Sequence, residues 1–215
     1  MRRAATIGGY MSRLLAVAIL IAAPVAQATS PDSLSPQDLA DIERIEAYLN
    51  SFDSLEARFV QMSSTGQVAE GDFLLSKPGK LRIDYDPPVP MQIIANGLFL
   101  VYEDTELEQQ THVPLASTPV GILVNEDITL NNDEIAVTAV DRGAAFIEVA
   151  VIRKDEPNAG EVRLVFSDRP LALKRWVVTD AQGVRTNFAL LGALTGVDID
   201  PDLFIVENKF PKDRQ

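Results

Sequence analysis

Two acidic residues are the first candidates for chemistry. Asp84 and Asp86 lie two positions apart among alternating apolar residues, so they share one face of an expected strand. Paired carboxylates can hydrolyse a glycosidic bond as general acid and base. They must lie in a cleft, and their surroundings must give them different pKa values. Acids that alternate with apolar residues are more often the solvent-exposed face of a sheet. The pattern therefore favours a structural role over hydrolysis.

A second acidic pattern has the alternating spacing of a calcium loop. Asp198, Asp200 and Asp202 match its first three ligand positions. The sixth position, which requires glycine, is Leu203, and the twelfth, which requires glutamate, is Lys209. These departures favour a solvated turn, and we expect no metal there.

Other reactive residue types are few. The 215 residues include one histidine, His112, and no cysteine, which excludes a thiol nucleophile, a disulfide and a cysteine zinc site. His112 has no acid beside it in sequence, and Gly121 lacks the lysine and further glycines of a phosphate loop. Trp176 is expected in the core or in a cavity. We therefore expect neither an enzyme nor a cofactor.

The charge balance limits the partners. Lys and Arg number 19 against 31 Asp and Glu, for a formal net charge of −12. Such a surface repels phosphate backbones, and no basic stripe is present, so nucleic acid is not an expected partner. An acidic exterior instead suits basic patches on partner proteins.

Residues 1–28 have the pattern of a cleaved secretory signal peptide. Arg2, Arg3 and Arg13 accompany ten consecutive apolar residues, 14–23, and Ala26-Gln27-Ala28 supplies a cleavage site. That run is about half of the roughly 20 residues that span a bilayer. Cleavage removes three arginines and no acid, which takes the net charge from −12 to −15. We expect a periplasmic monomer whose single domain covers residues 29–215.

One amphipathic helix is predicted at the start of that domain. Ser35 is a good N-cap, Pro36 suits the first helical position, and Asp38 places an acid in the first turn. Apolar residues then recur at helical spacing as far as residue 49. This apolar stripe must cover another element.

The period then changes to two, which predicts a succession of short strands. We expect them near 54–63, 67–76, 80–86, 90–95, 98–103, 107–113, 134–141, 144–152, 161–167, 171–179 and 184–191. The segment 118–124 suits a short helix or an apolar loop over the sheet. One helix followed by many strands predicts an α+β domain that is mainly antiparallel β.

The dipeptide Asn96-Gly97 predicts a hairpin with a two-residue turn. Pairing outward from it places Ala95 opposite Leu98, Ile93 opposite Leu100 and Met91 opposite Tyr102, all on one face. The other face has the pairs Ile94 with Phe99 and Gln92 with Val101. Because that face also carries Glu103, we expect it to be the wetter one.

Short motifs in a fixed order give the chain its resemblance to a known family. They are Phe59-x-Gln61, Gly71-Asp72-Phe73, Lys77-Pro78-Gly79-Lys80-Leu81-Arg82, Tyr85-x-Pro87, Asn96-Gly97 with Tyr102, Leu115-x-x-Thr118-Pro119 and Asp202-Leu203-Phe204. In this order, after an export signal and one helix, they resemble the LolA family of periplasmic lipoprotein carriers.

The resemblance implies an unclosed half β-barrel whose apolar concave face is covered by a helical lid. It also implies that the cavity shields the acyl chains of lipoproteins in transit to the outer membrane. An inner-membrane ABC-type release complex would load the cargo, and an outer-membrane receptor, if present, would accept it.

Apolar residues of the expected strands and helices supply this cavity and its lid. The expected cavity residues are Phe59, Phe73, Leu75, Leu81, Ile83, Tyr85, Met91, Ile93, Leu98, Leu100 and Tyr102. The expected lid residues are Leu39, Ile42, Ile45, Leu49, Val120, Ile122 and Leu123. Periodicity alone does not distinguish such a cavity from an ordinary packed core.

The family also favours an arginine that holds the empty lid shut, and Lys77 occupies the matching position. Lysine lacks the planar fork of arginine, so either the closed state is weaker or Arg82 substitutes. An alternative function on the same fold is a periplasmic sensor of lipids or lipoproteins.

Overall fold

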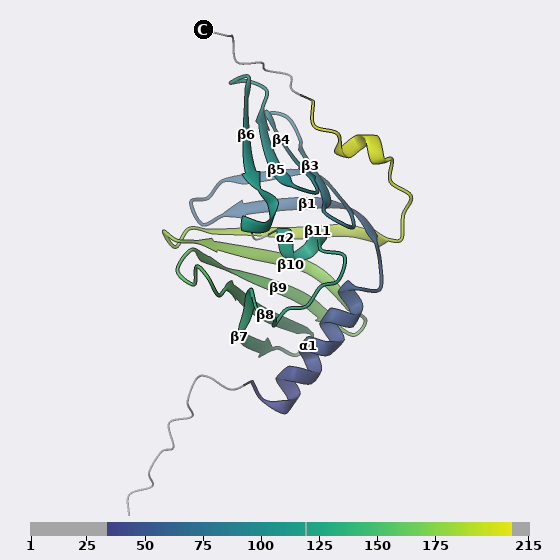
Figure 1. Cartoon of the computed structure of the whole chain (residues 1–215), viewed down its shortest axis with the longest axis vertical. Helices are drawn as coiled ribbons and strands as arrows, with labels where there is room; N and C mark the ends of the chain where they lie inside the picture. The colour runs from purple at the N-terminus through teal and green to yellow at the C-terminus, as the bar shows by residue number, and fades with distance from the viewer. Residues whose placement is uncertain (1–33, 119, 208–215) are drawn as a thin grey trace, which may run out of the picture. The chain divides into compact units, whose positions relative to one another are not determined.

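The computed structural model describes residues 34–118 and 120–207 (Figure 1). These residues belong to one structural unit of the chain, Asp32–Gln215. The predicted signal peptide lies outside the described residues. Within them, no helix is long and apolar enough to cross a membrane.

Helix α1 spans Pro36–Leu49, and its predicted start is confirmed. The Ser35 hydroxyl accepts a hydrogen bond from the Asp38 N–H, and the Asp38 carboxylate accepts one from the Ser35 N–H at 2.7 Å. This reciprocal capping satisfies amide groups that have no partner inside the helix. The helix buries Ile42, Ile45 and Leu49.

Within the described residues, eleven strands form one antiparallel sheet. They are β1 (Ser54–Ser63), β2 (Val68–Ser76), β3 (Lys80–Tyr85), β4 (Met91–Asn96), β5 (Phe99–Asp104), β6 (Gln109–Pro114), β7 (Ile135–Arg142), β8 (Phe146–Arg153), β9 (Gly160–Asp168), β10 (Leu171–Asp180) and β11 (Arg185–Thr195). The order is β6-β5-β4-β3-β2-β1-β11-β10-β9-β8-β7, and in the described chain the two end strands pair with no further strand. The predicted unclosed antiparallel sheet is therefore confirmed.

Two short helical segments connect β6 to β7. They are the 3-10 helix η1 (Leu115–Ser117) and helix α2 (Gly121–Val124), and all four residues of α2 are buried. A second 3-10 helix, η2 (Pro201–Phe204), follows β11.

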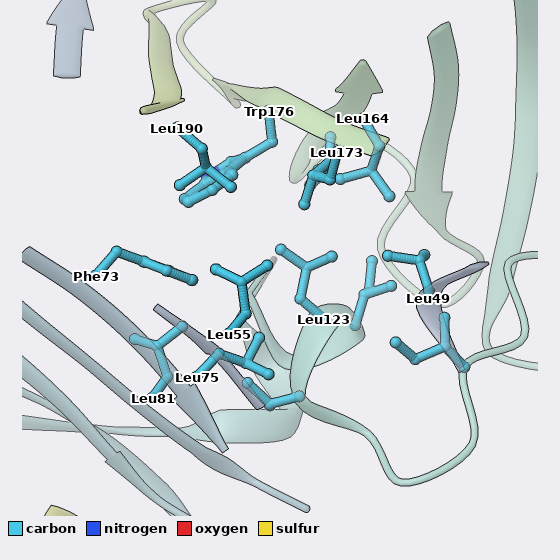
Figure 2. Close-up of a cluster of buried hydrophobic side chains, with 14 of the residues drawn as sticks. Leu49, Leu55, Phe73, Leu75, Leu81, Leu123, Leu164, Leu173, Trp176 and Leu190 are labelled. Carbon is cyan, nitrogen blue, oxygen red and sulfur yellow. The ribbon is translucent and has the colours of Figure 1, made fainter. Parts of the chain in front are cut away.

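The core lies between the concave face of the sheet and these helices. Figure 2 shows Leu55, Phe73, Leu75 and Leu81 on one side and Leu164, Leu173, Trp176 and Leu190 on the other, with Leu123 of α2 between them. Leu49 closes the cluster from α1. The concave face therefore packs side chains from distant parts of the chain into one cluster.

The predicted register of the hairpin between β4 and β5 is wrong by two residues. Ala95 pairs with Leu100 and Ile93 with Tyr102, and the two loop residues are Gly97 and Leu98. Asn96 precedes the turn, and its side chain accepts bonds from the N–H groups of Leu98 and Phe99. Gly97 has φ +99°, which favours glycine at this first loop position. A shift of two preserves the alternation of faces, so Ile93, Leu100 and Tyr102 still share one face.

The opposite face of this hairpin is not wet, contrary to the prediction. Ile94, Val101 and Glu103 are buried there. The segment around η2 lies over β3 and β4, where the Lys80 ammonium is 6.0 Å from the Phe204 ring. A pattern within one strand does not reveal cover supplied by a segment about 100 residues later.

Candidate functional site

A cavity of about 640 Å³ opens where β2 begins, β3 ends and β4 begins. Its volume falls within the roughly 300–1,000 Å³ of ordinary ligand pockets. Aliphatic and aromatic side chains dominate its wall, and none of the described residues that line it is charged. We call this cavity the first chamber.

Seven of the eleven predicted cavity residues line the first chamber. They come from β3, β4 and β5 and are Leu81, Ile83, Tyr85, Met91, Ile93, Leu100 and Tyr102. Alternation along the strands places them together, because every second residue points to the concave face.

Three further predicted residues pack in the core next to the lining residues and do not line the first chamber. Phe59, Phe73 and Leu75 are buried in the core. Phe59 packs edge-on against the Tyr85 ring at 5.2 Å between centroids. This contact needs Gly71, because a Cβ there would stand 2.7 Å from the Phe59 ring. These residues support the lining but do not form it.

Leu98 is a wrong prediction. It lies in the hairpin loop and is 74% exposed. The cause is the two-residue error in register, which had assigned this loop residue to the strand.

The wall opposite β3–β5 includes an aromatic pair from β10 and β11. Trp176 and Phe188 stack with their centroids 5.1 Å apart and their planes 13° from parallel. Trp176 was expected in the core or a cavity, and it is both buried and in the wall. Phe188, Val178 and Thr186 were missed, although alternation along 171–179 and 184–191 could have assigned their faces.

The polar groups of the first chamber are neutral. The Tyr85 hydroxyl donates to Gln61 Oε1 at 2.5 Å. Burial raises the pKa of Tyr85 to about 12 and also raises the pKa of Tyr102. Both phenols therefore stay protonated near neutral pH, and the wall presents hydroxyl and amide groups without charge.

The two predicted parts of the lid take different positions. Val120 and Leu123, beside and within α2, line the first chamber. Ile42, Ile45 and Leu49 of α1 pack into the core and do not line it. Leu39 is 52% exposed and lies outside the core, because the buried apolar stripe begins at Ile42.

Lys77 does not hold α2. Its ammonium donates to the Leu49 carbonyl at 2.5 Å and lies 5.0 Å from the centre of the Phe52 ring. It therefore binds the last residue of α1. Arg82 is no substitute, because it donates to Asp84 and to the carbonyl of Leu203 in η2. The bond between the sheet and α2 is made by backbone, from the Gly79 N–H to the Val124 carbonyl at 2.7 Å.

Asp84 and Asp86 lie in separate ion pairs and do not form a catalytic pair. Asp84 accepts from Arg82 at 2.7 Å and from Gln92, whereas Asp86 accepts from Arg58. Hydrogen bonding from Arg58 lowers the pKa of Asp86. Both acids serve the outer face of the sheet.

The other candidates for chemistry also have structural surroundings. Asp200 caps η2 by accepting from the Asp202 N–H at 3.0 Å. The His112 ring packs edge-on against Phe99 at 6.2 Å on the edge strand β6. Within residues 34–118 and 120–207, no group of three or more His, Asp or Glu could hold a metal ion.

An uncharged apolar cavity under a short helix is the site of a protein that binds an apolar ligand. A sequence model of the family described as "Outer membrane lipoprotein carrier protein LolA" matches residues 50–207. The chain belongs to this family. Its members are carriers that bind and transport, and they are not enzymes.

Two curated relatives have the same description, outer-membrane lipoprotein carrier protein. The one from Methylococcus capsulatus is 30% identical over 75% of this chain and 80% of its own length. The one from Halorhodospira halophila is 29% identical over 69% of this chain and 75% of its own. Among solved structures, a LolA superfamily protein from Nitrosomonas europaea matches 77% of this chain and 97% of its own with a TM-score of 0.47 at 10% identity.

Proposed function

We propose that this protein carries lipoproteins across the periplasm by sheltering their acyl chains in the first chamber. The observation that carries the proposal is the wall itself, which is apolar and uncharged and lies under a helix of four residues. Membership of the lipoprotein carrier family supports the identity of the cargo.

The energetics favour a chamber of this kind. Each methylene costs about 0.8 kcal/mol to expose, so one chain of about 16 carbons costs about 12 kcal/mol in water. An apolar wall removes much of that cost without directional bonds. Such a ligand can leave again when a membrane offers equal or better shelter.

The partners follow from the same proposal. The cargo comes from an inner-membrane ABC-type release complex and passes to an outer-membrane receptor or directly to the membrane. Basic patches on these partners would complement the acidic exterior. Export by a signal peptide at residues 1–28 would place the protein in the periplasm.

The test is native mass spectrometry of the protein purified from periplasm without detergent. We expect a population that carries triacylated lipoproteins, identified by their masses. Ile93→Glu places a charge in the wall of the first chamber and should abolish this population. Leu98→Glu is the matched control, because it adds the same charge to the exposed loop of the same hairpin.

Two results would contradict the proposal. Equal loading of the Ile93→Glu and Leu98→Glu proteins would show that the first chamber is not the site. Free lipid as the only adduct would favour a lipid sensor or lipid carrier on this fold.

A further inference from the structure

A second cavity, of about 670 Å³, lies on the other side of α2. It opens where β7 begins, β8 ends, β9 begins and β10 ends, and η1 and α2 form its remaining wall. We call it the second chamber. No residue predicted from the sequence to line a cavity belongs to it, apart from the lid residue Ile122.

The two chambers share a wall. Thr118, Val162 and Val178 line both of them. Neighbouring residues of α2 face different chambers, because Ile122 lines the second and Leu123 the first. Helix α2 therefore divides one concavity of the sheet into two compartments.

The second chamber has an apolar floor and an acidic rim. Ile135 and Val151 in the floor are buried core residues. The rim carries Asp133, Glu134, Glu156, Glu161 and Asp180, along with Arg153, which pairs with Asp155 at 2.6 Å. A hydrocarbon chain suits the floor, whereas an anionic headgroup at the rim would meet like charges.

The second chamber offers apolar space directly beside the first. A cargo with several acyl chains exposes several separate hydrocarbon surfaces, and each methylene costs about 0.8 kcal/mol in water. The two cavities have similar volumes, about 640 and 670 Å³. A single cargo molecule would therefore gain shelter for a further chain on the other side of α2.

We propose that the second chamber holds a second acyl chain of the same cargo molecule, with α2 lying between the two chains. This inference rests on the proposed function and extends it to a two-compartment site. The chambers lie side by side because they share wall residues, so chains that leave one headgroup can enter on either side of α2.

The experiment compares two probes, a fluorescent single-chain fatty acid of 16 carbons and a synthetic tripalmitoylated cysteine peptide. Ala159→Trp fills the second chamber from the exposed β8–β9 turn, and Ala116→Trp fills it from η1. Ala69→Trp fills the first chamber, and Ala145→Trp adds the same bulk to an exposed turn at the other end of β8. Circular dichroism checks that each variant is folded.

We expect Ala159→Trp and Ala116→Trp to weaken lipopeptide binding at least tenfold and to change fatty-acid binding less than twofold. Ala69→Trp should weaken the binding of both probes, and Ala145→Trp should weaken neither. Lipopeptide binding at the unchanged affinity in both second-chamber variants would overturn the inference and leave the proposed function intact. Failure of the unchanged protein to bind either probe would overturn the proposed function as well.

Discussion

The two helical covers of the concave face differ in how they are held. Helix α1 has 14 residues and is fixed near both ends. Asp41 accepts from Arg44 at 2.7 Å and from Arg142 at 2.6 Å. Near the other end, Asn50 exchanges two hydrogen bonds with the backbone of Ile128, at 3.0 and 2.8 Å. Helix α1 is thus bound to β7 and to the segment after α2.

Helix α2 has four residues and joins the sheet through the bond between Gly79 and Val124. Its Gly121 N–H also donates to the Thr118 carbonyl at 3.1 Å, and Ile122 and Leu123 add apolar contacts. Apolar contacts are not directional, so a hydrocarbon ligand can replace them at little cost. We therefore expect α1 to act as a fixed cap and α2 to be the element that a ligand displaces.

The largest expected effect is a loss of stability on truncation of a buried residue of α1. Ile45 is 0% exposed, so Ile45→Ala should lower the free energy of unfolding by about 3 kcal/mol through lost burial and a cavity. Urea denaturation measures it. Leu39→Ala in the same helix is the control and should change stability by less than about 0.5 kcal/mol. Equal losses in the two variants would contradict the assignment of α1 as a packed cap.

The ion pairs that attach α1 to the sheet should give the second-largest effect on stability. Asp41 is 6% exposed, and Asp41→Asn leaves Arg44 and Arg142 without their shared carboxylate. Breaking a fully buried pair costs about 3–5 kcal/mol, and the partly exposed arginines reduce this to about 2 kcal/mol.

The control for this variant is Asp155→Asn, which removes an exposed partner of Arg153. Exposed pairs contribute little, so we expect its denaturation midpoint to match that of the unchanged protein. A midpoint shift as large as that of Asp41→Asn would mean that the ion pairs of α1 stabilise the protein no more than an exposed pair does.

The lid should respond in ligand uptake more than in stability. A Cβ at Gly121 would stand 2.7 Å from the Leu115 carbonyl oxygen, so Gly121→Ala must shift α2 or η1. We expect a stability loss of about 1 kcal/mol and several-fold faster uptake of a fluorescent fatty acid in stopped flow. Ala145→Ser, at an exposed position in the turn before β8, is the control. Unchanged uptake in Gly121→Ala with faster uptake in Ile45→Ala would reverse the roles of the two helices.

The strands and α1 could be predicted because their signals are local. Capping at Ser35 and alternation from Ser54 onward depend on residues close in sequence. The faces of β3, β4 and β5 followed from alternation even where the register of the hairpin was wrong. Local patterns therefore gave most of one wall of the first chamber.

The rest of the site depends on contacts between distant segments. Phe188 and Val178 reach the chamber because β10 and β11 curve opposite β3, and the cover over Val101 comes from the segment around η2. The division of the concavity likewise depends on where the four residues of α2 pack against the sheet. Periodicity assigns a residue to a face and does not say which other face it will meet.

The smallest expected effect concerns Lys77, which binds α1 and not α2. The family resemblance assigned this residue to the lid, and the predicted lid included Leu49 of α1 as well as residues of α2. The Lys77 ammonium binds the Leu49 carbonyl at the end of α1. The last turn of α1 contains no basic residue, so Lys77 supplies a cation to the negative end of the helix from outside it. Lys77→Met keeps the stem over Phe52 and removes both the bond to Leu49 and the cost of burying the charge. Because these two effects oppose each other, stability at neutral pH should change by less than about 0.5 kcal/mol, with fatty-acid uptake unchanged.

The pH dependence of stability tests the cost of burying the Lys77 ammonium. Burial lowers the pKa of Lys77, while Asp53 and Asp127 oppose the shift. Between the lowered pKa and the ordinary pKa of lysine, the unfolded chain binds the extra proton, so stability gains a rising contribution as pH increases. Lys77→Met should lack this contribution when denaturation midpoints of the two proteins are compared from neutral to alkaline pH. Faster fatty-acid uptake by Lys77→Met would instead mean that Lys77 restrains the entry of ligand. The contrast between a fixed α1 and a displaceable α2 would then depend on Asp41 and Asn50 alone.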